Sequence, residues 1–259
     1  MGVLMEPYRT LRVRLDGPIC TVQIHRPEAN NTINDLLSEE FQQVLARYRD
    51  QMTVLVVEGL PEVFCFGADF KAIETGLAAG VAKGQNPEIL YNVWLDMATG
   101  PYISVAHVRG KANAGGIGFV SACDIVLADE TAVFSLSELL FGLMPACVLP
   151  FLIRRMGFQR AHYMTLMTQP VTVQKAAEWG LVDAFEANSE GLLRKHLLRL
   201  RRLSKKGITR YKRYMGDLDG TLLRHRPPAL AANLEVFTDR ENLDKIARYV
   251  QTGAFPWES

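Results

Sequence analysis

The chain has 259 residues, of which 48% are hydrophobic, so it is long enough for one well-packed domain and too apolar to be disordered. Its formal net charge of +1 excludes a bulk polyelectrolyte role, and its apolar runs end short of the roughly 18 residues that a membrane span needs. Residues 1–7 lack the basic and apolar regions of a secretory signal. The four cysteines lie in apolar surroundings without CxxC spacing, which predicts buried free thiols and a cytoplasmic protein.

Alternating side chains predict a β-hairpin near the start of the chain. Residues 11–15 and 19–24 alternate in polarity, and Asp16-Gly17 between them is a hairpin turn signal. A helix is predicted next, with Asn34 or Asp35 as its N-cap, because the apolar residues that follow share one face.

Two buried strands are predicted in the first half, over residues 53–58 and 102–108. A short helix is expected over 90–99. Residues 72–90 contain several glycines and little periodicity, and are predicted to form a mobile segment near a ligand. The order strand, helix, strand predicts right-handed βαβ units and an α/β fold.

A glycine-rich turn follows the second of these strands. Gly115, Gly116 and Gly118 allow a tight turn or a close approach to a ligand. A helix starting just after them would direct free N–H groups and its dipole at whatever lies there, a suitable place for an oxyanion. A tight strand–helix turn made of small residues is the alternative.

The middle of the chain contains one isolated acid. A short strand is predicted over 132–136, and Glu138 follows it among apolar neighbours. A buried carboxylate there is costly unless it has a partner or a chemical role; a helix-capping glutamate is the alternative. Helices are predicted over 150–169, interrupted at Gly157, and over 173–179.

The last third is predicted to be helical and segregated in charge. Residues 194–213 contain ten cations, no acid and an apolar leucine face, which predicts one amphipathic helix with a basic outer surface. This basic surface could simply be solvated, or it could bind an acidic protein, nucleotide phosphates or nucleic acid. A break is predicted at 225–228 and a final helix over 230–250.

Several of these stretches, in this order and spacing, resemble the crotonase (enoyl-CoA hydratase/isomerase) superfamily over roughly residues 8–255. The motifs are residues 25–31 (HRPEANN), 62–71 (EVFCFGADFK), the glycine turn with Cys123-Asp124-Ile125, and 176–183 (AAEWGLVD). The resemblance implies an α/β crotonase fold, with repeated ββα units in a spiral core over 1–190 and a C-terminal helical trimerisation region over 191–259.

The resemblance also implies site residues for acyl-thioester chemistry. The backbone amides of Ala68 and Gly115 match the positions that hold the thioester oxygen as it becomes an enolate. Glu138 matches the second of two glutamates in the family's hydratases, whereas the first falls at Gly118. A two-carboxylate water addition is therefore not expected, and Glu138 is predicted to serve as both general base and general acid.

A narrower resemblance points to the PksH-type dehydratases of bacterial polyketide β-branching, carried by residues 26–35, 58–69 and 135–142. It implies dehydration of a 3-hydroxy-3-methylglutaryl thioester on an acyl carrier protein to the 3-methylglutaconyl thioester. No cofactor is expected beyond the carrier's phosphopantetheine arm, or coenzyme A.

Further contacts are predicted with substrate and partner. Asn113, Gly116 and Lys71 are candidate substrate-binding residues, although Asn113 could equally stabilise the turn. Arg201, Arg202 and Lys205 are candidate contacts to an acidic carrier protein. A homotrimer or hexamer is expected, because residues 230–250 and the aromatic end at 255–257 have few obvious partners in one domain. Neither a membrane nor a metal site is predicted.

The alternatives are a sister methylglutaconyl-thioester decarboxylase, an ordinary enoyl-CoA hydratase or isomerase, and an RNA-binding crotonase homologue. The RNA-binding alternative depends only on the basic 194–213 segment.

Overall fold

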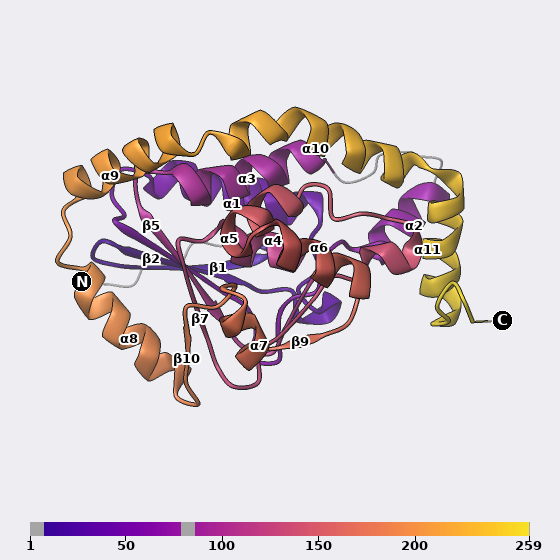
Figure 1. Cartoon of the computed structure of the whole chain (residues 1–259), viewed down its shortest axis with the longest axis horizontal. Coiled ribbons are helices and arrows are strands. Elements are labelled where there is room, and N and C mark those ends of the chain that lie inside the picture. Colours follow the sequence, from indigo (N-terminus) through magenta and orange to yellow (C-terminus); the bar gives the residue numbers. More distant parts are fainter. Residues whose placement is uncertain (1–7, 79–85, 259) are drawn as a thin grey trace.

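The computed structural model describes residues 8–78 and 86–258, which form two β-sheets and the helices around them (Figure 1). The first sheet has six strands in the order β1-β2-β3-β5-β7-β10, with β1 and β2 antiparallel and the others parallel. The second has four short strands in the order β4-β6-β8-β9. The bounds are β1 Leu11–Asp16, β2 Ile19–Ile24, β3 Val54–Glu58, β4 Val63–Cys65, β5 Ile103–Val108, β6 Lys111–Asn113, β7 Ile125–Ala128, β8 Val133–Ser135, β9 Val171–Thr172 and β10 Ala184–Phe185.

Each turn of the chain adds one strand to each sheet and then a helical segment. The successive pairs are β3 with β4, β5 with β6, and β7 with β8. This arrangement confirms the predicted crotonase-type spiral of ββα units and the strands predicted over 53–58 and 102–108. The hairpin is confirmed too, with Gly17 at φ +58° in its turn.

Side-chain caps begin several of the helices. Asn34 caps α1, as predicted, by accepting a hydrogen bond from the Leu37 N–H. The bounds are α1 Asp35–Tyr48, α2 Phe70–Ala78, α3 Pro87–Thr99, α4 Gly115–Ala122, α5 Leu149–Met156, α6 Phe158–Met167, α7 Val173–Glu178, α8 Ser189–Leu200, α9 Lys205–Leu218, α10 Thr221–Thr238 and α11 Arg240–Thr252, with 3-10 turns η1 Pro27–Ala29 and η2 Glu138–Phe141.

Aromatic side chains of α3, α4 and α5 meet in the core. Trp94 packs edge-on against Phe119 and Phe151, with ring centroids 5.7 and 5.9 Å away. α10 runs along α3, as Figure 1 shows, and the Tyr91 hydroxyl donates to the Leu222 carbonyl. Residues of the predicted C-terminal region therefore share the main core.

The basic segment 194–213 is two helices rather than one. α8 ends at Leu200, and Ser204 caps α9 by accepting from the Gly207 N–H. Its cations do not all face solvent, because Lys212 is only 5% exposed and its ammonium donates to the Asp124 carboxylate. The prediction of a single amphipathic helix with a basic outer surface is wrong: the first helix ends before the Ser204 cap, and Lys212 is buried in an ion pair.

The break predicted at 225–228 is also wrong, because α10 continues through Pro227 and Pro228. Contacts on both sides of the prolines hold it: Arg226 bonds to Asn92, and the Ala229 carbonyl accepts from the Cys147 thiol. The break lies instead at Asp239, which caps α11 by accepting from the Asn242 N–H. The single helix predicted over 230–250 is therefore divided between α10 and α11.

Two smaller expectations also need correction. α4 begins at Gly115, so the glycines lie inside its first turn rather than before it. Residues 72–78 continue α2, and α3 begins at Pro87 with Asn86 as its cap, so most of the segment predicted to be mobile is helical; residues 79–85 lie outside the described part of the chain.

The C-terminal helices return to their own chain. α11 packs beside α2 and η2 at the end of the molecule opposite α8 (Figure 1). Phe141, Tyr249 and Phe255 form an aromatic cluster with centroid separations of 5.1–6.1 Å. The premise that the aromatic end lacks partners within one chain is therefore wrong. Among the described helices, none is long and apolar enough to cross a membrane.

Candidate active site

A cavity of about 960 Å³ opens between the glycine turn, η2, α2 and α11. Its volume is typical of small-molecule sites, and apolar side chains such as Phe141 and Phe237 make up much of its wall. Ala68, Gly115 and Glu138 all line it. The three residues that the crotonase resemblance singled out for chemistry are therefore brought to one cavity.

Glu138 is the first residue of η2 and faces the cavity with a shielded carboxyl group. Its Oε2 atom is buried and finds no hydrogen-bond partner among the described residues. Burial raises the pKa of Glu138 from 4.5 to about 7, against the opposing effect of the backbone N–H groups of Ser137 and Glu138. A carboxyl group with that pKa can both accept and return a proton at neutral pH.

Two backbone amides line the same cavity without an acceptor. Ile33 and Ala68 form a parallel bridge in which the Ile33 N–H donates to Gly67 and the Asp69 N–H donates to Ile33. This leaves the Ala68 N–H directed away from Ile33. The Gly115 N–H starts α4, and neither it nor the Ala68 N–H donates a hydrogen bond within the described part of the chain.

Gly67 lets these two amides lie close together. Its φ is +87°, and a Cβ there would lie 2.6 Å from the Ala114 Cβ and 3.3 Å from the Gly115 nitrogen. Only glycine allows both this conformation and this approach. The two N–H groups can therefore act as an oxyanion hole for a thioester oxygen.

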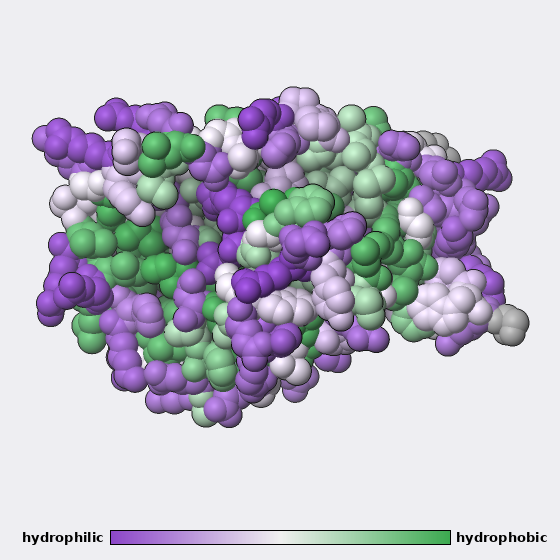
Figure 2. Space-filling view, in the orientation of Figure 1, coloured by the Kyte–Doolittle hydropathy of each residue, from purple (hydrophilic) through white to green (hydrophobic). Residues whose placement is uncertain are grey.

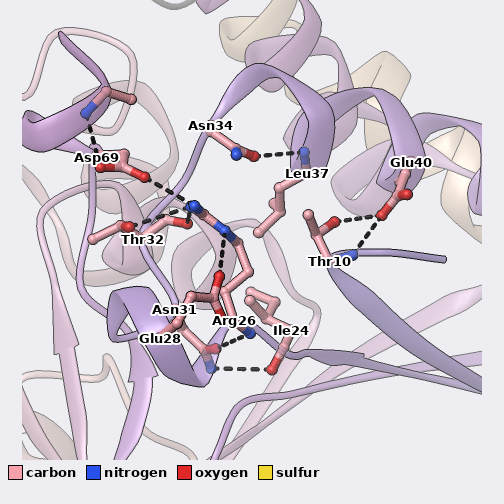
Figure 3. A network of polar contacts seen from close by, with 11 residues as sticks. Thr10, Ile24, Arg26, Glu28, Asn31, Thr32, Asn34, Leu37, Glu40 and Asp69 are labelled. Atoms are coloured by element: carbon pink, nitrogen blue, oxygen red, sulfur yellow. Dashed lines mark hydrogen bonds and ion pairs between the residues drawn. The ribbon is translucent and has the colours of Figure 1, made fainter. Parts of the chain in front are cut away.

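A buried polar network holds the Ala68 loop in place (Figure 3). Arg26 donates to the Thr32 carbonyl at 2.5 Å and to the Asp69 carboxylate at 2.9 Å. The Asn31 side chain donates to Ile24, Val63 and Phe64 carbonyls, and accepts from the Arg26 N–H. The motif at residues 25–31 thus fixes an amide that lies some forty residues further along the chain.

Asn113 links the glycine turn to the Glu138 segment. Its side-chain oxygen accepts from the Ser135 hydroxyl at 2.8 Å, and its NH₂ group donates to the Ser137 hydroxyl at 3.0 Å. Although Asn113 lines the cavity, both ends of its amide are thus occupied. Of the two predicted roles, the geometry favours the stabilising one.

α11 braces η2 from the other side. The Asn242 side chain donates to the carbonyls of Gly142 and Val236, each at 3.1 Å. Gly142 has φ +76°, and a Cβ there would lie 2.1 Å from the Asn242 Oδ1. Sequence reasoning missed Asn242, whose only signal is its place three residues after the Asp239 cap.

The remaining candidate residues lie in different settings. Lys71 is exposed at the cavity wall on α2, whereas Gly116 does not line the cavity and packs against the Cys65 carbonyl. Arg201 pairs with Asp16, and the Lys205 ammonium donates to the Arg49 and Met52 carbonyls. Arg201, Arg202 and Lys205 lie around the start of α9, at the opposite end of the molecule from α2 and α11 (Figure 1).

A serine, histidine and glutamate meet away from the cavity. His107 contacts Glu58 through Nδ1 at 2.7 Å and Ser189 through Nε2 at 3.0 Å. Burial raises the pKa of Glu58, but the His107 hydrogen bond and nearby cations outweigh it and leave the pKa lowered. Ser189 is buried and lines neither described pocket, so this trio joins α8 to the sheet and has a structural role.

The four cysteines are free and buried, as predicted. Burial raises the pKa of Cys20, Cys65, Cys123 and Cys147 to about 12 in each case, so none is a thiolate at neutral pH. This includes Cys147, which lines the cavity. Glu138, by contrast, lines the cavity with a carboxyl group whose pKa of about 7 suits proton transfer.

The sequence matches the enoyl-CoA hydratase/isomerase family over residues 14–259, and the chain belongs to that family. It is an enzyme of the hydratase and dehydratase type with the crotonase fold. Among its relatives, the bacillaene synthase dehydratase PksH of Bacillus subtilis (strain 168) is 60% identical over 252 residues, covering 97% of each chain.

Solved structures agree with this assignment. The crystal structure of a polyketide biosynthesis enoyl-CoA hydratase (PksH) from Bacillus subtilis matches with a TM-score of 0.94 at 60% identity, covering 96% of this chain and 100% of that one. An enoyl-CoA hydratase/isomerase from Xanthobacter autotrophicus Py2 matches with a TM-score of 0.84 at 20% identity, covering 95% and 94%, and so shows the fold alone. Both resemblances seen in the sequence, to crotonases and to PksH-type dehydratases, are confirmed.

Proposed function

We propose that this enzyme dehydrates a 3-hydroxy-3-methylglutaryl thioester, carried on an acyl carrier protein, to the 3-methylglutaconyl thioester in polyketide β-branching. The observation that carries the proposal is the shielded carboxyl group of Glu138, whose Oε2 atom has no hydrogen-bond partner among the described residues and whose pKa is about 7, in one cavity with two free amides. The named dehydratase relative from a polyketide pathway supports the substrate class.

The reaction needs one carboxyl group. Glu138 removes the proton on C2, and the electron pair moves onto the thioester oxygen, to which the Ala68 and Gly115 N–H groups donate. The pair then returns to form the C2–C3 double bond as the C3–O bond breaks. The departing hydroxide takes the proton back from Glu138 and leaves as water, which restores the carboxylate.

Lys71, exposed at the cavity wall, is proposed to contact the incoming substrate. The acidic carrier protein is proposed to be recognised by the cations around the start of α9. Since Lys205 is committed to backbone carbonyls, Arg202 and the surface-paired Arg201 are the better candidates.

A trimer or a pair of trimers remains our proposal for the assembly. Apolar side chains reach the surface on the face that carries α6, as Figure 2 shows. Phe158, Tyr163 and Leu166 on α6 are 54–62% exposed, which is more apolar surface than one helix of a monomer usually presents to water.

Mass spectrometry of the acyl carrier protein tests the function directly. Incubating 3-hydroxy-3-methylglutaryl carrier protein with the enzyme should remove one water from the acyl group. Offering the 3-methylglutaconyl thioester separates the alternatives, because a decarboxylase would release carbon dioxide from it. Absence of water loss, with turnover of crotonyl-CoA instead, would assign the chain to the ordinary hydratases.

A further inference from the structure

The position at which hydratases of this family carry their first glutamate is covered in this protein. Gly118 lies in the first turn of α4, three residues after the Gly115 amide, and is buried. A Cβ on Gly118 would lie 2.4 Å from Cζ2 and 2.5 Å from Cη2 of the Trp94 ring. No side chain therefore fits at position 118 while the indole ring stays in place.

Trp94 itself reaches the cavity. The ring comes from α3, is 1% exposed and lines the cavity wall, whereas Gly118 does not line it. The indole ring therefore separates Gly118 from the cavity. Its Nε1 has no hydrogen-bond partner among the described residues, so packing against Phe119 and Phe151 sets its position.

We propose that Trp94 is the specificity-determining residue that makes this a one-carboxylate site. The indole ring occupies the volume that a second acid at position 118 would need, and gives that part of the cavity an apolar wall. Such a wall can neither activate a water molecule nor take its proton, but it can pack against an alkyl branch on the acyl group. This proposal rests on the proposed dehydration, which supplies the substrate. It adds that Trp94 makes the site select acyl thioesters that are branched at C3.

The first test measures thermal unfolding and does not depend on activity. Gly118→Ala should lower the melting temperature clearly in the wild-type background, because the methyl group meets the indole ring. In the Trp94→Leu background the same substitution should have a much smaller effect. Equal effects in both backgrounds would show that the ring does not limit position 118, and would overturn the proposal.

The second test measures hydration of an unbranched thioester, the reaction that the indole ring is proposed to prevent. Trp94→Leu combined with Gly118→Glu should add water to a crotonyl pantetheine thioester at least about tenfold faster than Trp94→Leu alone, since a positioned acid–base group contributes about 10²–10⁴-fold. Gly118→Glu alone should be unstable or inactive. Circular dichroism checks that each variant is folded.

The outcomes separate this proposal from the proposed function. A folded double variant with no gain in hydration, or a stable Gly118→Glu variant that hydrates as well as the double variant, overturns the role of Trp94. If the double variant does not fold, the thermal test with alanine decides. Failure of the wild-type enzyme to dehydrate the hydroxymethylglutaryl thioester, together with a hydrating double variant, refutes the substrate and leaves the steric role of Trp94 standing.

Discussion

The two walls of the cavity are built differently. The hydrogen-bonded wall lies within residues 28–33, 66–69 and 113–115, where Arg26 from behind the wall and side-chain amides hold backbone groups in fixed positions. The apolar wall consists of α2, η2, α11 and Phe255, which meet through aromatic and aliphatic side chains. An oxyanion hole needs fixed dipoles, whereas an acyl chain needs a surface that can adapt, so each wall suits what it contacts. Glu138 lies where the two walls join.

Removing the charge at this junction should have the largest effect. Glu138→Gln keeps the shape of both walls and should lower turnover by at least about 10²–10⁴-fold, because the base is lost. Dehydration of the carrier-bound substrate, followed by mass spectrometry, measures this. Turnover near the wild-type value would show that another group removes the proton.

The same variant should be more stable than the wild type at alkaline pH. The pKa of Glu138 is about 7 in the folded protein and near 4.5 when exposed, so the native state binds more protons between these values and its stability falls as pH rises. A glutamine side chain stays neutral at every pH, so the folded protein does not lose stability by ionising it. Melting temperatures at pH 8 should therefore favour Glu138→Gln, and those below pH 4.5 should be similar.

Gly67→Ala should break the hydrogen-bonded wall. The added methyl group would meet Ala114 at 2.6 Å in a backbone conformation that alanine rarely adopts. Displacing one oxyanion donor lowers turnover by about 10²–10³-fold in known cases. Gly17→Ala is the matched control, since it has φ +58° with no atom within 4 Å of its Cβ, and it should lose stability but keep its turnover. Similar losses of turnover in both variants would argue against the oxyanion hole.

The pH dependence of kcat/KM should follow the titration of Glu138, the proposed base. Below pH 7 the Glu138 carboxyl group is increasingly protonated, so kcat/KM should fall about tenfold per pH unit, with a plateau above it. Initial rates with a pantetheine thioester between pH 5 and 8.5 measure this without a carrier protein. A profile that is flat from pH 5 to pH 7 would contradict the raised pKa.

Asn242→Ala should loosen the apolar wall and have the smallest effect. It removes the hydrogen bonds to Gly142 and Val236, of which the bond to Val236 is buried, and the loss of a partner for a buried carbonyl costs about 1–3 kcal/mol of stability. Turnover should fall several-fold, because η2 carries Glu138 but keeps its link through Ser137 to Asn113. Thermal unfolding and kcat, measured together, check it; an unchanged melting temperature would show that α11 does not brace the turn.

The sequence was most informative where local patterns determine structure. Alternation predicted the hairpin, apolar runs predicted the two buried strands, and Glu138 stood out as an acid in an apolar run. Contacts between distant residues were not predictable. Neither the packing of Trp94 over Gly118 nor the bond from Asn242 to Gly142 leaves a local signal. The helix through Pro227 and Pro228 was missed because tertiary contacts outweighed a local rule.

The bond between Asn242 and Gly142 spans 100 residues, and this separation has a consequence for biosynthesis. As the chain emerges from the ribosome, the segment with Glu138 appears well before the helix that braces it. Closing this loop costs slightly more entropy than closing the loop between Arg26 and Asp69, which are 43 residues apart. The brace between α11 and η2 therefore forms only after nearly the whole chain has emerged, although the groups of the oxyanion hole, Ala68 and Gly115, are made in its first half.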